Sequence, residues 1–356
     1  MEWKEVTISD IANLKNGKKR PSESGVIPVF GGNGIMDYVN SFNGEDTIVI
    51  GRVGAYCGCV YLSKGKCWVS DNAIAVKAKE DNDNEYLYYL LSSLNLNYHH
   101  IGGAQPLMTQ DIIGRIEVIV PQTKDDQHRI ASILSPLDRK IELNNKINAD
   151  LEEMAQAIFK NWFVDFEPFK GGKFVDSELG MIPEGWKVGC LGDIAEITSG
   201  KRPPKKSKDK TKELFIPLIG ASDIMGFTSD VLYERPILVI GRVGTHGVVQ
   251  RFQEKCWPSD NTLVIESSYY NYVYQLLKGI DYSAINRGST QPLITQTDVK
   301  NTDVIIAPEN VLKEYESITS TLFSKHRANI KENSRLSLLR DTLLPRLMSG
   351  ELEVPE

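Results

Sequence analysis

The segment DDQHRIASILSPLDRKIELNNKINADLEEMAQAIFKNWF, residues 125–163, determines the organisation of this chain. Steps of alternating fours and threes from Ile130 reach apolar residues throughout, apart from Asn144 and Asn148. A seam of period 3.5, flanked by charged residues, predicts a long helix. Because such a seam must be buried, the helix needs a second helix as its partner.

A second stretch of similar character, residues 312–348, supplies that partner. We predict that the two helices pack along a seam that includes Ile141, Leu151, Ile158, Leu336, Leu339 and Leu343. Pro136 lies inside the first helix, where a proline removes a backbone donor and clashes with the preceding turn. We therefore expect a short helix to about residue 134, a break, and a long helix that begins near Pro136.

The rest of the chain is an internal duplication. The segment WKEVTISDIANLKNGKKRP at 3–21 returns as WKVGCLGDIAEITSGKRPP at 186–204. Further pairs follow in the same order: IPVFGGNGIM (27–36) with IPLIGASDIM (216–225), IGRVGAYCG (50–58) with IGRVGTHG (240–247), KCWVSDN (66–72) with KCWPSDN (255–261), and AQPLMTQ (104–110) with TQPLITQ (290–296). Two long copies indicate a duplicated domain, because a solenoid needs three or more short units.

Each copy combines β-branched runs with one short apolar helix, and each is followed by a long helix. The predicted fold class is therefore α/β (α+β), with two tandem repeated domains separated by two long coiled-coil helices. The predicted boundaries are a first domain at 1–123, a central helix at 124–166 with a break near Pro136, a linker at 167–185, a second domain at 186–309, a C-terminal helix at 310–350 and a tail at 351–356.

Composition excludes several classes of protein. No apolar run is long enough to span a bilayer, and the N-terminus does not resemble a signal peptide. The five cysteines form no CxxC pair, which is typical of a reducing cytoplasm. A zinc site built from Cys57, Cys59 and Cys67 with the neighbouring histidines is disfavoured, because the second copy retains only Cys256.

Motifs for catalysis are absent from the sequence. It contains no GxxxxGK[ST] phosphate loop, no GxGxxG, no base-methylation motif of the Asn/Asp-Pro-Pro-aromatic type and no Pro-Asp…Glu-x-Lys nuclease motif. We therefore expect a protein that is not an enzyme and that binds neither a cofactor nor a metal.

Signals for nucleic-acid binding are local, because the net charge is −6. Two loops carry flexible cations that can meet phosphates: Lys18, Lys19 and Arg20 in the first copy, and Lys201, Arg202, Lys205 and Lys206 in the second. The alternative for each loop is a solvated lysine-rich surface. Arg52 and Arg242 follow a strand within a glycine turn, where an arginine can reach a guanine edge or a phosphate, or can brace the turn through carbonyls.

Further positions are candidates for base recognition. Gln105 and Gln291 each precede a proline in a glycine-rich loop and carry the amide that suits adenine, although a scaffolding role is equally open. Tyr56 and His246 occupy equivalent places after the two arginine turns but differ in type. Such differences would allow two equivalent folds to recognise different bases.

Nearly the whole chain resembles the DNA-specificity subunit of type I restriction–modification systems. Beside the tandem pattern, the resemblance is carried by ASILSPLDRKIELNNKIN in the central helix, KNWFVDFEPF at its end, SELGMIPEGW in the linker and LRDTLLPRLMSGELEV at the C-terminus. It implies a non-catalytic cytoplasmic subunit with two target-recognition domains, each recognising one half of a split, asymmetric site in double-stranded DNA. It also implies antiparallel helices that hold the domains apart and dock two methyltransferase subunits, which use S-adenosylmethionine, with motor-endonuclease subunits joining for cleavage.

Two other classes remain as alternatives. A two-lobed protein–protein scaffold without DNA binding is favoured by the acidic pI of about 5.6. A fused restriction–methylation enzyme would need the catalytic motifs that the sequence lacks.

Overall fold

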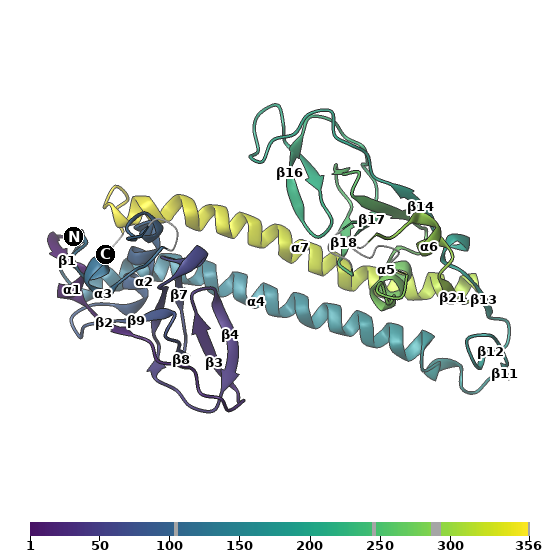
Figure 1. Ribbon diagram of the computed structural model, residues 1–356, viewed down its shortest axis with the longest axis horizontal. Coiled ribbons are helices and arrows are strands. Elements are labelled where there is room, and N and C mark those ends of the chain that lie inside the picture. The colour runs from purple at the N-terminus through teal and green to yellow at the C-terminus, as the bar shows by residue number, and fades with distance from the viewer. Residues whose placement is uncertain (103–105, 244–246, 286–292, 355–356) are drawn as a thin grey trace. The chain divides into compact units, whose positions relative to one another are not determined.

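The computed structural model of the chain describes residues 1–102, 106–243, 247–285 and 293–354. It divides into two compact units, of which unit 1 comprises Met1–Asn145 with Ile330–Glu356 and unit 2 comprises Lys146–Asn329. Each unit contains one copy of the repeat together with parts of two long helices, α4 (Lys124–Phe163) and α7 (Glu309–Met348) (Figure 1).

Unit 1 is a mixed α/β domain. Its elements are β1 (Trp3–Thr7), α1 (Ile8–Ile11), β2 (Ala12–Asn16), β3 (Ile27–Gly31), β4 (Gly34–Val39), β5 (Gly44–Glu45), β6 (Ile48–Gly51), η1 (Gly54–Tyr56), β7 (Val60–Leu62), β8 (Lys66–Val69), β9 (Ala73–Ala78), α2 (Asn84–Ser93), η2 (Leu96–Tyr98), α3 (Gln110–Gly114) and β10 (Glu117–Pro121). The strands form sheets in the orders β2-β9-β6-β7, β4-β3-β8-β5 and β1-β10.

Unit 2 repeats this topology. Its elements are η3 (Glu167–Phe169), β11 (Phe174–Val175), β12 (Ile182–Pro183), β13 (Lys187–Cys190), η4 (Leu191–Asp193), β14 (Glu196–Ser199), β15 (Ile216–Ile219), β16 (Ile224–Thr228), β17 (Ile237–Gly241), β18 (Val249–Phe252), β19 (Trp257–Pro258), β20 (Thr262–Glu266), α5 (Tyr270–Gly279), α6 (Gln296–Lys300) and β21 (Asp303–Ile306). The sheet orders β14-β20-β17-β18, β16-β15-β19 and β13-β21 correspond to those of unit 1, where β5 is an additional edge strand. The duplication in the sequence is therefore a duplication of the fold.

A buried central strand organises each core. All of β6 in unit 1 and all of β17 in unit 2 are buried, as their continuous β-branched and aliphatic runs predict. The apolar helices α2 and α5 belong to the same cores, to which they contribute Tyr86 and Tyr272, each 1% exposed. The predicted strands and short helices of both copies are present.

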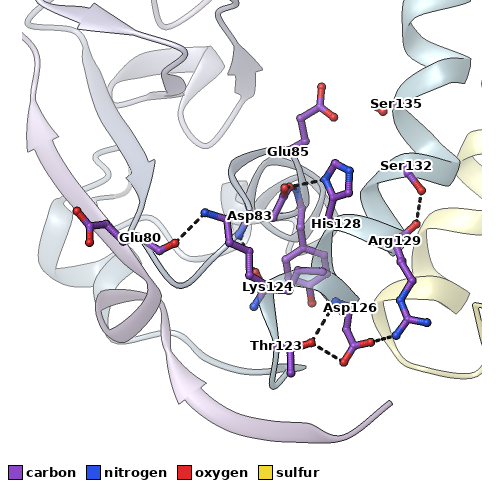
Figure 2. Close-up of polar contacts among 12 residues, drawn as sticks. Glu80, Asp83, Glu85, Thr123, Lys124, Asp126, His128, Arg129, Ser132 and Ser135 are labelled. Carbon is purple, nitrogen blue, oxygen red and sulfur yellow. Dashed lines mark hydrogen bonds and ion pairs between the residues drawn. The ribbon is translucent and has the colours of Figure 1, made fainter. Parts of the chain in front are cut away.

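The start of α4 is fixed to the first domain by a set of polar contacts (Figure 2). The Thr123 hydroxyl accepts from the Asp126 amide at 3.1 Å and donates to the Asp126 carboxylate at 2.7 Å. This is an N-cap, and Arg129 completes it with an ion pair to Asp126. Lys124 and His128 reach outward from the same turn to the Glu80 carbonyl and the Asp83 carboxylate, respectively.

The predicted break near Pro136 is wrong, because α4 continues through Pro136 without interruption. A proline inside a helix costs about 3 kcal/mol. Packing offsets that cost here, since Ala131 and Leu134 in the preceding turn are fully buried in the core of unit 1. Ser135 also accepts a hydrogen bond from Arg139 at 2.9 Å, which links the turns on either side of the proline.

The two long helices run antiparallel within each unit. In unit 1, Asp138 pairs with Arg340 at 2.6 Å and Asn144 donates to Asn333 at 2.9 Å, so residue numbers rise along α4 as they fall along α7. In unit 2, Asn329 donates to Asn148 at 2.9 Å and Phe159 contacts Tyr315, so residue numbers again run in opposite directions. The asparagines that interrupt the apolar seam thus pair with asparagines of the other helix.

The predicted seam residues have different environments. Five are half-buried, namely Ile141, Leu151, Ile158, Leu336 and Leu343. Leu339 is 46% exposed, so its assignment to the seam is wrong. The next residue, Arg340, faces α4 in its place, because its guanidinium group pairs with Asp138.

Candidate nucleic-acid interface

The basic loop of the first copy is held at its start by the turn between β8 and β9. The Gly17 amide donates to the Ala73 carbonyl and the Lys18 amide donates to the Val69 carbonyl, both at 3.0 Å. The indole of Trp68 donates to the Lys18 carbonyl at 3.1 Å. The backbone at Lys18 is therefore anchored, while Lys19 and Arg20 after it are exposed.

The second copy has the same arrangement. The amides of Gly200 and Lys201 donate to the carbonyls of Thr262 and Pro258, both at 3.0 Å. The Trp257 indole donates to the Lys201 carbonyl at 2.7 Å. The two matched tryptophans therefore hold the backbone of the basic loops in place.

Glycine is required at the start of each basic loop. A Cβ on Gly17 would lie 1.9 Å from the Ser70 carbonyl oxygen, and a Cβ on Gly200 would lie 2.1 Å from that of Ser259. Real Cβ atoms do not approach oxygen so closely, so any larger residue would push the loop off its anchor. This explains why a glycine stands at this position in both copies.

Most of the predicted cations are accessible and available. Lys18, Lys19, Lys201, Arg202, Lys205 and Lys206 are all exposed or half-exposed, and within the described ranges their side chains form no ion pair. Arg20 differs, because it forms an ion pair with Asp37 of β4. The two loops therefore present cations whose charge is free to meet phosphate.

The arginine turns lie beside the anchored loops. The Arg52 amide donates to Asn72 and its carbonyl accepts from Met108, at 2.9 and 2.8 Å. Arg242 is held likewise by Asn261 and Ile294, at 2.8 and 3.0 Å. In both arginines the side-chain Nε is buried and has no hydrogen-bond partner among the described residues. Backbone hydrogen bonds therefore hold each turn in place, and the arginine Nε takes no part in them.

The positions after the arginine turns are only partly described. Tyr56 is 47% exposed and lies in η1, where Gly54 has a φ of +73° that favours glycine. The Gly54 amide donates to the Pro106 carbonyl at 3.1 Å, so the segment that begins at Pro106 lies against this turn. Gln105, His246 and Gln291 lie outside the described residues, and their roles stay predictions.

The cysteines of the chain are free thiols, of which Cys57, Cys67 and Cys256 are buried. Burial raises the pKa of the Cys57 and Cys67 thiols, and raises that of Cys256 to about 12. No three His, Cys, Asp or Glu side chains of the described chain come together as a metal site requires.

Each unit therefore has the geometry of a contact surface. An anchored cationic loop lies beside a braced arginine turn, and a hairpin, β3–β4 in unit 1 and β15–β16 in unit 2, adjoins them. The family described as type I restriction modification DNA specificity domain matches residues 1–153 and again residues 183–335. The chain belongs to this family.

Relatives along most of the chain are specificity subunits. A type I restriction enzyme specificity subunit of Methanocaldococcus jannaschii is 31% identical over 84% of this chain and 76% of its own length. A putative type I specificity subunit of Mycoplasma genitalium is 24% identical over 99% of this chain and 95% of its own length. The predicted assignment to the specificity subunit, and not to an enzyme, is thus confirmed.

A solved structure has the same fold. The crystal structure of the type I restriction–modification S subunit from M. genitalium superposes with a TM-score of 0.68 at 18% identity, covering 98% of this chain and 96% of that one. The predicted fold class, two repeated α/β domains with long helices, is therefore confirmed. Within the described part of the chain, no helix has the length and apolar character needed to cross a membrane.

Proposed function

We propose that each target-recognition domain of this specificity subunit contacts one half of a split, asymmetric site in double-stranded DNA. The observation that carries the proposal is the repetition of one surface with different side chains. Both copies anchor a cationic loop through a tryptophan and brace an arginine beside it, but Tyr56 of the first copy is matched by His246 in the second. Equivalent positions with unlike side chains suit two different half-sites.

The division of labour within this surface follows from its chemistry. The lysines of the loops suit phosphates, which position a protein on the duplex without carrying sequence information. Arg52 and Arg242 lie on turns that backbone hydrogen bonds hold in place, and the guanidinium group of an arginine can donate to both O6 and N7 of guanine. We assign phosphate contacts to the loops and base contacts to the residues of the two arginine turns.

The helices supply a surface for protein partners. Large apolar side chains are exposed along them, namely Leu143 and Met154 on α4 and Ile318, Ile330, Leu338 and Leu339 on α7. In unit 1 the neighbouring residues Leu338 and Leu339 are both exposed, and adjoining exposed apolar side chains are typical of a protein-binding surface. We assign this surface to two methyltransferase subunits, which would carry S-adenosylmethionine, with motor-endonuclease subunits completing the complex in the cytoplasm.

Selection from a randomised duplex library tests the DNA proposal. The purified full chain, alone and with methyltransferase subunits, should enrich a bipartite sequence whose halves differ. Binding to random duplex should weaken steeply as salt rises, because bound cations release counterions. Enrichment of a single continuous motif would contradict the split site, and failure to bind any duplex would favour a protein scaffold.

Charge substitution on a helix tests the docking surface. Leu338 is 70% exposed, so Leu338→Asp should fold like the parent and no longer associate with methyltransferase subunits in co-purification. Ile119→Asp, at a 60% exposed position of β10, is the matched control and should retain association. If both variants still associate with methyltransferase subunits, the docking surface does not include Leu338.

A further inference from the structure

The hairpin beside each basic loop contains the same β-bulge. In unit 1, Val29 pairs with Asp37 and Phe30 pairs with Ile35, which leaves Met36 as the extra residue. In unit 2, Leu218 pairs with Gly226 and Ile219 pairs with Ile224, which leaves Met225 as the extra residue. Bulges redirect a side chain locally and are common next to functional sites.

Each bulge exposes an apolar pair. Met36 is 56% exposed and Ile35 is 51% exposed, while Met225 and Ile224 are 47% and 45% exposed. Packing does not require a large apolar side chain at an exposed bulge. Its presence at the same place in both copies therefore points to a contact with something outside the chain.

The apolar pair adjoins the cationic loop in both units. In unit 1, the Ser70 amide donates to the Phe30 carbonyl at 2.9 Å, which joins the hairpin to the turn that anchors the loop. Arg20 of the loop pairs with Asp37, the residue after Met36.

Unit 2 joins the hairpin to the anchoring turn through the equivalent bond and has a second bond to the loop. The Ser259 amide donates to the Ile219 carbonyl at 3.0 Å, and the Ser207 amide of the loop donates to the Phe227 carbonyl at 2.9 Å. An apolar pair bordered by lysines complements a duplex, because the cations meet phosphates while the apolar atoms meet the faces of bases.

We propose that Met36 and Met225, each supported by its neighbouring isoleucine, are apolar wedges that press into a base step of each half-site and partly unstack it. The proposal rests on the proposed DNA function. The two methionines are identical although the half-sites differ, so their contact cannot select between bases. A stacked face, which every base step offers, is the feature that both half-sites share. Proteins that insert apolar side chains between base steps use methionine in this way.

Fluorescence of 2-aminopurine tests the wedge, because the base analogue brightens when its stacking partners move away. With the full chain bound, analogues placed along each half-site should brighten at one step per half. Met36→Ser should abolish the signal in one half-site only, and Met225→Ser in the other. Affinity should fall roughly tenfold for each variant, since burial of a methionine side chain is worth about that factor or more. The preferred bases should stay the same.

Two controls separate contact from folding. Met36→Leu keeps an apolar side chain of similar size and should retain the signal. Ile119→Ser removes an exposed apolar side chain from β10, away from the hairpin in the sheet order, and should change nothing.

The outcomes distinguish this proposal from the one on which it rests. Sequence-specific binding without any brightening would overturn the wedge and leave the DNA function intact. A parent chain that binds no DNA would overturn both. Variants that keep DNA binding and brightening but no longer bind methyltransferase subunits would overturn the wedge in favour of a protein contact.

Discussion

The two copies of the repeat share their candidate contact surface but differ in the interior that supports it. At one matched position of the sheets the first copy has Leu62, opposite Ile48, and the second has Arg251, opposite Leu238. Leu62 packs on the apolar core of unit 1. The Arg251 guanidinium is enclosed by the rings of Tyr270, Tyr274 and Phe323, at 4.9, 4.5 and 3.5 Å from their centroids. The interior has therefore diverged, while the anchored loop, the arginine turn and the bulge are the same in both copies.

Because the two interiors differ, truncating Arg251 or Leu62 should destabilise the two units by different amounts. Arg251→Ala removes three cation–π contacts and a 2.6 Å hydrogen bond to Asn271, so unit 2 should be destabilised by about 2–4 kcal/mol. Leu62→Ala in unit 1 should cost about 1–2 kcal/mol, because the side chain is half-buried. Hydrogen exchange in β17 and β6 measures each unit separately. A smaller cost for Arg251→Ala than for Leu62→Ala would show that the aromatic enclosure adds no stability.

The asparagine pairs of the helices give a second comparison. Asn329 and Asn148 in unit 2 are both buried, so Asn329→Ala should cost about 1–3 kcal/mol by leaving the Asn148 amide oxygen without its donor. Asn333 of unit 1 is half-buried, and Asn333→Ala should cost less than about 1 kcal/mol because Asn144 keeps its bond to Glu332. Chemical denaturation checks the order. The double variant Asn148→Leu with Asn329→Leu leaves no unpaired amide and should recover the stability that Asn329→Ala removes. If it does not, the destabilisation by Asn329→Ala comes from lost packing and not from the unpaired Asn148 oxygen.

The basic loops should differ in their salt dependence. Replacing Lys201, Lys205 and Lys206 by glutamine should lower the salt slope of DNA binding by about 0.9 for each phosphate that is no longer neutralised. In the first loop, Lys19→Gln should lower the slope, whereas Arg20→Gln should change it less because Arg20 is paired with Asp37. Binding to specific and random duplex should weaken alike. An unchanged slope in the triple variant would show that its loop is a solvated surface.

Protonation of His326 should make the stability of unit 2 slightly dependent on pH. Burial lowers the pKa of His326 in α7, beside Glu152 and Arg251, so the folded state favours the neutral side chain. The unfolded chain binds the proton more readily, so the contribution to stability is complete above the unfolded pKa of about 6.5 and declines as the pH falls below it. Hydrogen exchange at about pH 7.5 and 5.5 should show a smaller pH-dependent change in His326→Asn than in the parent. If the variant and the parent show an equal change in hydrogen exchange, other groups cause the pH dependence.

Much of the fold follows from local sequence pattern, and the exceptions have physical causes. The central strands and the helices α2 and α5 are predicted because their apolar runs reflect burial directly. The continuity of α4 at Pro136 is not, because the local proline penalty is offset by long-range packing of Ala131 and Leu134. Spacing alone predicts Leu339 in the seam, but the ion pair of Arg340 with Asp138 decides which residue faces α4.

The residues of the candidate site can be predicted from the sequence better than the contacts that hold them in place. The cationic loops and arginine turns stand out as repeated polar motifs. The anchoring role of Trp68 and Trp257 depends on hydrogen bonds across the fold, although their place in both KCW runs is an available signal. The bulges at Met36 and Met225 arise from strand register, which a single hairpin sequence does not specify.

In the proposed function, the two domains recognise their half-sites independently. Substitutions in separate cores with no shared partner should add in free energy. The direct measurement is binding of Arg52→Gln, Arg242→Gln and the double variant to duplex libraries in which each half-site is randomised separately. Each single variant should relax base preference in one half-site only, by about 1–3 kcal/mol, and the double variant should relax both. Relaxation of both half-sites by one substitution, or of neither by any, would contradict the account.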